Sequence, residues 1–312
     1  MAAADIFALT GTLLPLALFV LLGWLIGRWK DIDPAPIATV LVYAVSPVVA
    51  FGSTAQIAFK GAFVALPAIT GAIAAICAGA SLLAGRRFLR DKDSAWLLPM
   101  TCGTGNNGYF GLPLALVLFP GDAAGIYFLI MLGATLFEST AGYYAVARGH
   151  LPLRQALARA VRLPMVYAIA GGMAFSALGA TLPPAAVAAT ATARGCYVTL
   201  GMMLVGLALA RHRRLSLPPD FLALTLGGKY ILWAVLVAGF ALLDTQALHL
   251  YTADIHAMMF ILAITPVAAN SVAYAAENRF RPELAATVVF VTTLLSCLLL
   301  PFALGWIAAL RL

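Results

Sequence analysis

Long apolar stretches separated by short polar connections make up almost the whole chain. An α-helix rises 1.5 Å per residue, so about 20 apolar residues are needed to cross a hydrocarbon core roughly 30 Å thick. Ten stretches of the chain meet this requirement. The pattern therefore predicts an all-α polytopic membrane protein with ten transmembrane helices, at 6–27, 35–55, 62–84, 95–119, 123–147, 163–180, 185–210, 221–243, 255–276 and 284–308.

Polar, helix-breaking residues interrupt the fourth and ninth spans, at 103–113 and 265–271. Each interruption comes about eleven residues into its span, which is roughly 17 Å of helix and close to the bilayer midplane. Irregular backbone is tolerated at that depth only where protein buries it or where it lines a cavity, because lipid offers no hydrogen-bond partners. A pair of broken spans is typical of a carrier's binding site.

The residues at the two breaks suggest an anion site. The half-helices after the breaks would point their N-termini at the midplane from opposite faces, and each N-terminus carries about half a positive charge. Asparagine amides there can donate to and accept from a small carboxylate. We predict substrate contacts from Gly105, Asn106, Asn107, Pro266, Asn270 and Ser271, with Gly105, Gly108, Pro113 and Pro266 shaping the breaks and the crossing. The alternative is that these small and polar residues serve only close helix packing.

Composition and charge placement set the class and the orientation. The chain is 63% hydrophobic and 10% charged, whereas soluble domains contain about 25% charged residues. Nearly all Lys and Arg lie in the odd-numbered connections, with Lys60 and Arg311 on the other side. Such residues stay in the cytoplasm, so both termini are expected outside the plasma membrane, or the inner membrane of a Gram-negative cell. This basic rim accounts for the net charge of +7 without a nucleic-acid partner.

The span count predicts an inverted repeat. Five spans fall in 1–147, a basic connection occupies 148–162, and five spans follow in 163–312. An odd number of crossings in each half makes the second half enter the membrane from the opposite side, and the fourth span of each half carries the break.

Several motifs resemble the auxin efflux carrier family, whose bacterial members include malonate and malate permeases. The run 105–114, GNNGYFGLPL, is similar to the family's fourth-span signature, and 46–51, SPVVAF, to its second-span segment. Pro266, Asn270, Glu277 and 282–286 resemble its C-terminal pattern.

That resemblance implies how the spans are arranged and how they move. Spans four and nine would cross at their broken centres. Spans one, two, six and seven would form a scaffold that also makes a dimer contact, and the other six spans would carry substrate by an elevator movement. Plant members place Pro where this chain has Gly105, and they have an acidic residue in the third span, where 62–84 has no charge. Neither an auxin substrate nor that proton site therefore transfers.

Charged side chains within spans are further candidates, since each is costly in lipid unless it is solvated or paired. Glu138 can titrate or bind a cation, or its carboxyl can simply form hydrogen bonds with Ser139, Thr140 or a neighbouring helix. Arg194 can neutralise an anion or pair with an acid. Lys229 is expected to extend to the cytoplasmic rim.

A second acidic residue, Glu277, is expected to form an ion pair with Arg279 or Arg281 at the rim.

The motifs of membrane enzymes are missing from the sequence: it has no HExxH, no GxSxG and no metal-binding aspartate pair. The four cysteines show no CxxC spacing and the four histidines form no cluster, so we expect neither a metal nor another cofactor. We therefore expect no enzyme but a secondary transporter of a small organic anion, embedded in the bilayer. An ion or solute channel and, more remotely, an intramembrane lipid-modifying enzyme are the alternatives.

Overall fold

The computed structural model describes residues 3–30, 32–119, 123–147, 154, 162, 164–211 and 218–310. These described residues form helices and turns, with no β-strand among them. Five of their helices are long and apolar enough to cross a membrane, at 34–54, 61–88, 125–146, 219–248 and 282–299. Large apolar side chains on them are exposed, including Leu83, Ile231 and Leu298 at 69%, 67% and 70%, which suits contact with lipid. The chain is therefore an all-α membrane protein, as predicted.

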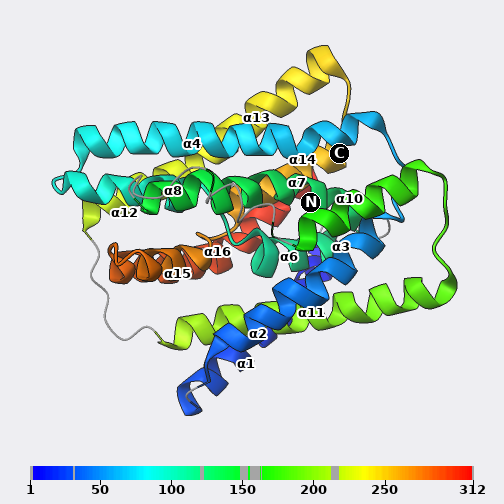
Figure 1. Ribbon diagram of the computed structural model, residues 1–312, viewed down its shortest axis with the longest axis horizontal. Helices are drawn as coiled ribbons and strands as arrows, with labels where there is room; N and C mark the ends of the chain where they lie inside the picture. The colour runs from blue at the N-terminus through cyan, green and yellow to red at the C-terminus, as the bar shows by residue number, and fades with distance from the viewer. Residues whose placement is uncertain are drawn as a thin grey trace.

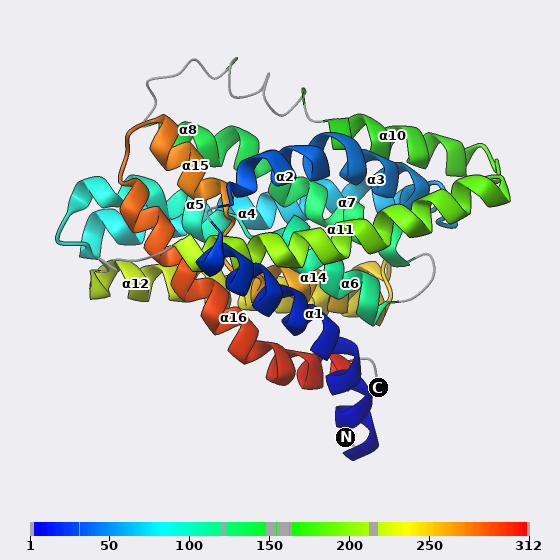
Figure 2. The ribbon, with the colours of Figure 1, turned by 90° about the horizontal axis from the view of Figure 1, so that it is seen from below.

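One group of helices packs around α11 (Pro184–Arg211), which lies along α1 (Ala3–Trp29). Figure 2 shows α1, α11 and the neighbouring helices together. The small residues Gly23 and Gly206 stand where α1 and α11 meet, so that the two backbones come into contact. The other members of this α11 group are α2 (Pro34–Val40), the π-helical turn η1 (Leu41–Val45), α3 (Ser46–Thr54) and α10 (Pro164–Ala177).

The remaining helices form a second group, in which α4 (Leu66–Phe88) packs on α7 (Ala123–Phe137). In Figure 1, α4 and α11 run along opposite sides of the molecule with α7 between them. The first half of this α4 group comprises η2 (Gly61–Ala65), η3 (Lys92–Leu97), α5 (Leu98–Gly103), η4 (Asn107–Gly111), α6 (Leu112–Leu118), η5 (Glu138–Gly142) and α8 (Tyr143–Val146). The second half comprises α12 (Pro219–Leu226), η6 (Gly227–Leu232), α13 (Trp233–Leu243), η7 (Asp244–Leu248), α14 (Ala253–Ile264), α15 (Asn270–Glu277) and α16 (Pro282–Leu310).

Helices occupy each of the apolar stretches that the sequence pattern predicts, and both predicted interruptions are present. The fourth stretch is divided between α5 and the continuous pair η4–α6, and the ninth between α14 and α15. Among the described residues, four helical turns of π type, namely η1, η4, η5 and η6, widen the backbone within these stretches, and a fifth, η7, directly follows the eighth stretch. Turns of π type often mark functional positions. Residues 120–122 and most of the connection 148–162 lie outside the described residues.

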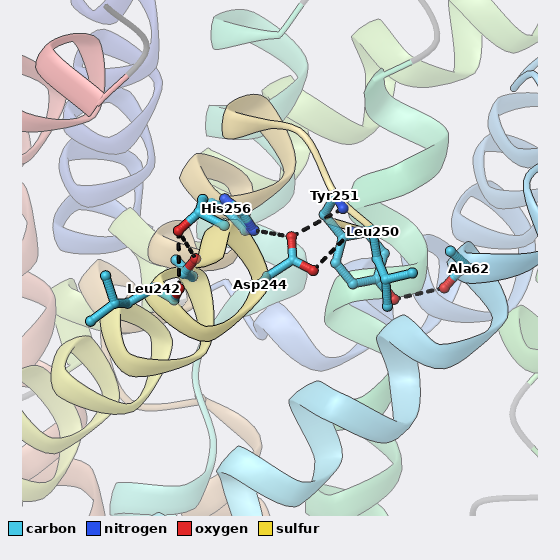
Figure 3. A network of polar contacts seen from close by, with 8 residues as sticks. Ala62, Leu242, Asp244, Leu250, Tyr251 and His256 are labelled. Carbon is cyan, nitrogen blue, oxygen red and sulfur yellow. Dashed lines mark hydrogen bonds and ion pairs between the residues drawn. The ribbon is translucent and has the colours of Figure 1, made fainter. Parts of the chain in front are cut away.

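A buried polar network fixes the turn between α13 and α14 (Figure 3). Asp244 is fully buried and accepts hydrogen bonds from the backbone N–H groups of Leu250 and Tyr251, both at 3.0 Å. The Nε2 atom of His256 lies 2.9 Å from Oδ2 of the same carboxylate. The Tyr251 hydroxyl in turn donates to the carbonyl of Ala62, 2.7 Å away. The network therefore ties the start of α14 to the start of η2 and sets the direction in which α14 runs toward its break.

Candidate functional site: a polar cavity at two helix breaks

The two broken segments touch each other through their backbones. After α5 ends at Gly103, residues 104–106 are non-helical, and after α14 ends at Ile264, residues 265–269 are non-helical. The N–H of Asn106 donates to the carbonyl oxygen of Pro266 at 2.8 Å. A second bond runs from the Thr265 hydroxyl to Oδ1 of Asn107 at 3.0 Å. Backbone groups freed by one break are thus satisfied by the other, as the absence of water in lipid demands.

A cavity of about 110 Å³ opens beside this crossing. Both groups of helices contribute to it, because η1, α3, α10 and α11 form one wall and the broken segments with α7 and η5 form the other. Its polar lining residues are Ser46, Asn106, Asn107, Tyr109, Thr135, Glu138, Ser139, Tyr197, Asn270 and Tyr274, and Gly105 and Gly108 contribute backbone. A cavity of this size suits a compact molecule, since pockets for drug-sized ligands measure about 300–1,000 Å³.

The cavity brings together five of the residues predicted from sequence to bind substrate or shape the breaks: Gly105, Asn106, Asn107, Gly108 and Asn270. Asn106 and Asn107 are buried, while Asn270 is exposed at the cavity mouth. Asn106 also caps η4, its Oδ1 accepting from the N–H of Tyr109 at 3.2 Å. The Nδ2 of Asn270 donates to Oε1 of Glu138 at 2.8 Å. Glu138, which is 6% exposed, therefore lies against a predicted substrate residue.

Four other predicted residues lie away from the cavity lining. Pro266 belongs to the crossing through its carbonyl, and Pro113 stands inside α6, beyond the non-helical residues. Ser271 is fully buried, and its hydroxyl has no hydrogen-bond partner among the residues that the structure describes. Arg194 donates to the hydroxyl of Ser53 at 2.9 and 3.2 Å and so links α11 to α3.

At the predicted rim, the Tyr143 hydroxyl donates to Glu277 at 3.0 Å, and Arg281 pairs with Asp91.

The prediction that Lys229 extends to the membrane rim is wrong. Its side chain is fully buried, and its Nζ donates to the carbonyl of Leu262 at 2.7 Å, with the Thr265 hydroxyl 3.4 Å away. The physical reason is that α14 ends at this point, so the carbonyls of its last turn lack helical partners. Those oxygens form the negative end of the helix dipole, which attracts an ammonium group. They lie within reach of the Lys229 side chain, so it binds them instead of extending to the rim.

The other broken helix ends in the same manner. The indole N–H of Trp233 donates to the carbonyl of Cys102, in the last turn of α5, at 2.6 Å. Trp233 follows Lys229 by one helical turn, and the Lys229 ammonium lies 5.1 Å from the centre of its ring. One segment, η6 with the start of α13, thus caps the negative ends of both broken helices. The positive ends, at η4 and α15, begin at cavity residues and face the cavity instead.

Aromatic and hydroxyl residues that the sequence did not single out complete the site. Tyr109 and Tyr197 stack with ring centroids 6.3 Å apart, which joins η4 to α11 beside the cavity. The hydroxyl of Tyr127 reaches the carbonyl of Asn107 at 3.5 Å. No sequence pattern singles out these residues, because their partners are distant along the chain. Within the described residues, no group of three or more His, Cys, Asp or Glu side chains is placed to hold a metal ion.

Comparison with known proteins does not assign the chain to a family. No protein-family model matches the chain, and no curated protein matches it. The fold and the site define an all-α membrane protein with a polar cavity at the meeting point of two interrupted helices.

Proposed function

We propose that the protein is a secondary transporter of small organic anions, with the substrate bound in the cavity at the two breaks. The observation that carries this proposal is the sorting of helix ends at the crossing. Both negative ends are capped by donors from η6 and α13, namely Lys229 and Trp233. Both positive ends open toward the cavity. A bound anion would therefore meet about half a positive charge from each of two helices in surroundings of low dielectric constant.

The polar groups of the cavity suit a carboxylate. Asn106, Asn107 and Asn270 carry amide donors that can bind carboxylate oxygens from several directions. Glu138 is the single acidic side chain among the cavity's lining residues, and its carboxylate, when ionised, competes with a substrate anion for the amide of Asn270. Protonation of Glu138 would remove the like charge and weaken its hydrogen bond to that amide, which would favour an anion that enters together with a proton.

The proposed architecture follows from the sequence pattern and the family resemblance. Ten spans would form two inverted repeats, 1–147 and 163–312, joined by the connection 148–162, with the fourth and ninth spans crossing at the bilayer midplane. Both termini would face outward from a plasma membrane, and the family would be that of the auxin efflux carriers. The α11 group would be the scaffold and dimer contact, and the α4 group would be the moving domain. The cavity's position between these two groups supports an elevator mechanism, because sliding one group along the other would carry the cavity across the membrane.

Uptake into proteoliposomes tests the proposal. Purified protein is reconstituted and offered radiolabelled mono- and dicarboxylates, with and without a proton gradient. Uptake should saturate with substrate concentration, and Asn106→Ala should abolish it while the variant stays monodisperse in detergent. Asn278→Ala is the matched control, because Asn278 lies outside the cavity and its side-chain amide donates to the carbonyl of Tyr274, in the helix that Asn278 caps. Full activity of Asn106→Ala would show that the residues at the break serve helix packing and not substrate binding. A current that does not saturate with ion concentration would indicate a channel.

A further inference from the structure

The Lys229 ammonium is held in surroundings that resemble a cation-binding site. Its contacts are a carbonyl oxygen of a helix C-terminus, a hydroxyl and an aromatic ring, at Leu262, Thr265 and Trp233. No carboxylate of the described residues pairs with it. Free Na⁺ ions in carriers are coordinated by carbonyls at the ends of interrupted helices, which is the same kind of ligand. The side chain thus places its ammonium group where such an ion would bind.

We propose that Lys229 is a resident cation of the crossing, which supplies the positive charge for anion binding and makes a co-bound metal cation unnecessary. This inference rests on the proposed function of anion transport. It assigns a positioning and charge role to a residue that does not line the cavity. Transport by the wild-type protein should therefore be independent of Na⁺ and K⁺.

Lys229 acts on the cavity through Thr265. The Thr265 hydroxyl has one proton, and it lies within hydrogen-bond distance of two acceptors, the Leu262 carbonyl at 2.9 Å and Oδ1 of Asn107 at 3.0 Å. The bond from Lys229 occupies one of the two lone pairs of the Leu262 carbonyl and makes that oxygen a weaker competitor for the Thr265 proton, which favours donation to Asn107. Asn107 is then held by its oxygen, and the donors of its Nδ2 remain available for an anion. Removal of Lys229 would return the Thr265 proton to Leu262 and release the Asn107 amide from its orientation.

Stability alone does not account for a lysine at this position. Burial of an ammonium group without a carboxylate partner costs free energy, and replacing buried charges by apolar groups of similar size often stabilises a protein. Methionine has nearly the length of lysine and no charge. Lys229→Met should therefore fold with a melting temperature at or above that of the wild type, and should lose anion uptake by roughly tenfold or more, the scale of one or two charge-assisted hydrogen bonds.

Three variants test the charge itself. Lys229→Met removes it, Lys229→Ala removes it and leaves space, and Lys60→Met removes an exposed lysine elsewhere as a matched control. Uptake of the anion that the wild type transports fastest is measured in sodium, potassium and choline media. We expect equal wild-type rates in all three media, normal rates for Lys60→Met, and loss for both Lys229 variants. Ethylammonium should partly restore uptake by Lys229→Ala and should not restore uptake by Lys229→Met, whose side chain fills the site.

Each contrary result identifies which proposal fails. Wild-type uptake that requires Na⁺ or K⁺, or a fully active Lys229→Met variant, would overturn the resident-cation inference and leave anion transport standing. Wild-type protein that transports no anion would refute the proposed function. In that case, and also if Lys229→Met does not fold, the resident-cation inference is tested by thermal melting of Lys229→Ala. Ethylammonium should raise its melting temperature by more than it raises that of the wild type, and equal shifts would overturn the inference.

Discussion

Gly105 is the position where one added methyl group should do most damage to the crossing. A Cβ atom there would lie 2.5 Å from the Thr265 hydroxyl oxygen, 2.7 Å from the Lys229 ammonium and 2.8 Å from Oδ1 of Asn107. All three distances are shorter than a carbon atom tolerates, so Gly105→Ala must push the three polar groups apart. Two hydrogen bonds join these groups, from Lys229 to Thr265 and from Thr265 to Asn107. Leaving buried polar groups unsatisfied costs about 1–3 kcal/mol for each bond, so the free energy of unfolding should fall by roughly 2–6 kcal/mol.

The measurement is a thermal melt of purified Gly105→Ala in detergent together with its uptake rate. For a chain of this size, each kcal/mol lowers the melting temperature by about 2–4 °C, so a fall on the order of 10 °C is expected. Uptake should decline at least as strongly as in Lys229→Met, because the same contacts with Thr265 and Asn107 are lost. Gly227→Ala is the control, since a Cβ atom on Gly227, two residues before Lys229, meets no atom within 4 Å. Equal melting temperatures for the two variants would refute the reasoning.

Three further substitutions probe separate parts of the structure. Glu138→Gln keeps the acceptor that Asn270 uses and removes the acidic charge, so KM for the anion should fall severalfold in uptake assays; an unchanged KM would show that the charge does not act on the substrate. Trp233→Phe removes the donor to the α5 end and should cost about 1–3 kcal/mol, measured as a lower melting temperature. Asp244→Asn presents an N–H₂ group to backbone donors or to His256 and should cost a similar 1–3 kcal/mol without changing KM, because its network lies outside the cavity lining.

The interruptions were predictable because they are local properties of the chain. Gly105, Asn106 and Pro266 stand in apolar surroundings where a helix would otherwise continue, and lipid leaves their freed backbone groups no partner except each other. The direct bond from Asn106 to Pro266 follows from that constraint. The same local rule does not say which side chains beyond the breaks lie near the cavity. Ser271 illustrates this limit, since it follows Asn270 directly and yet turns away from the cavity.

Lys229 and the Asp244 network were missed because their partners are distant in sequence. The position of Lys229 along its span predicts that its side chain reaches the cytoplasmic rim. The fold shows that the carbonyls at the end of α14 lie closer to its ammonium group than the rim does. The pairing of His256 with Asp244 depends on how the chain turns between α13 and α14. The structure also gives a reason for glycine at 105: the volume that a side chain would need is already occupied by Lys229 and Thr265.

The crossing offers an anion a moderate and reversible attraction. None of the cavity's lining residues is Lys or Arg, so a substrate would meet amide groups and helix ends in place of a direct ion pair. A fully buried ion pair is costly to break once its partner leaves, whereas partial helix charges attract an anion with about half a unit charge each. The Lys229 ammonium adds to this attraction without contacting the anion, because Thr265 lies between them. When the anion leaves, the ammonium keeps its bond to the Leu262 carbonyl, so release leaves no group newly unpaired. This arrangement suits a protein that must bind its substrate on one side of a membrane and release it on the other.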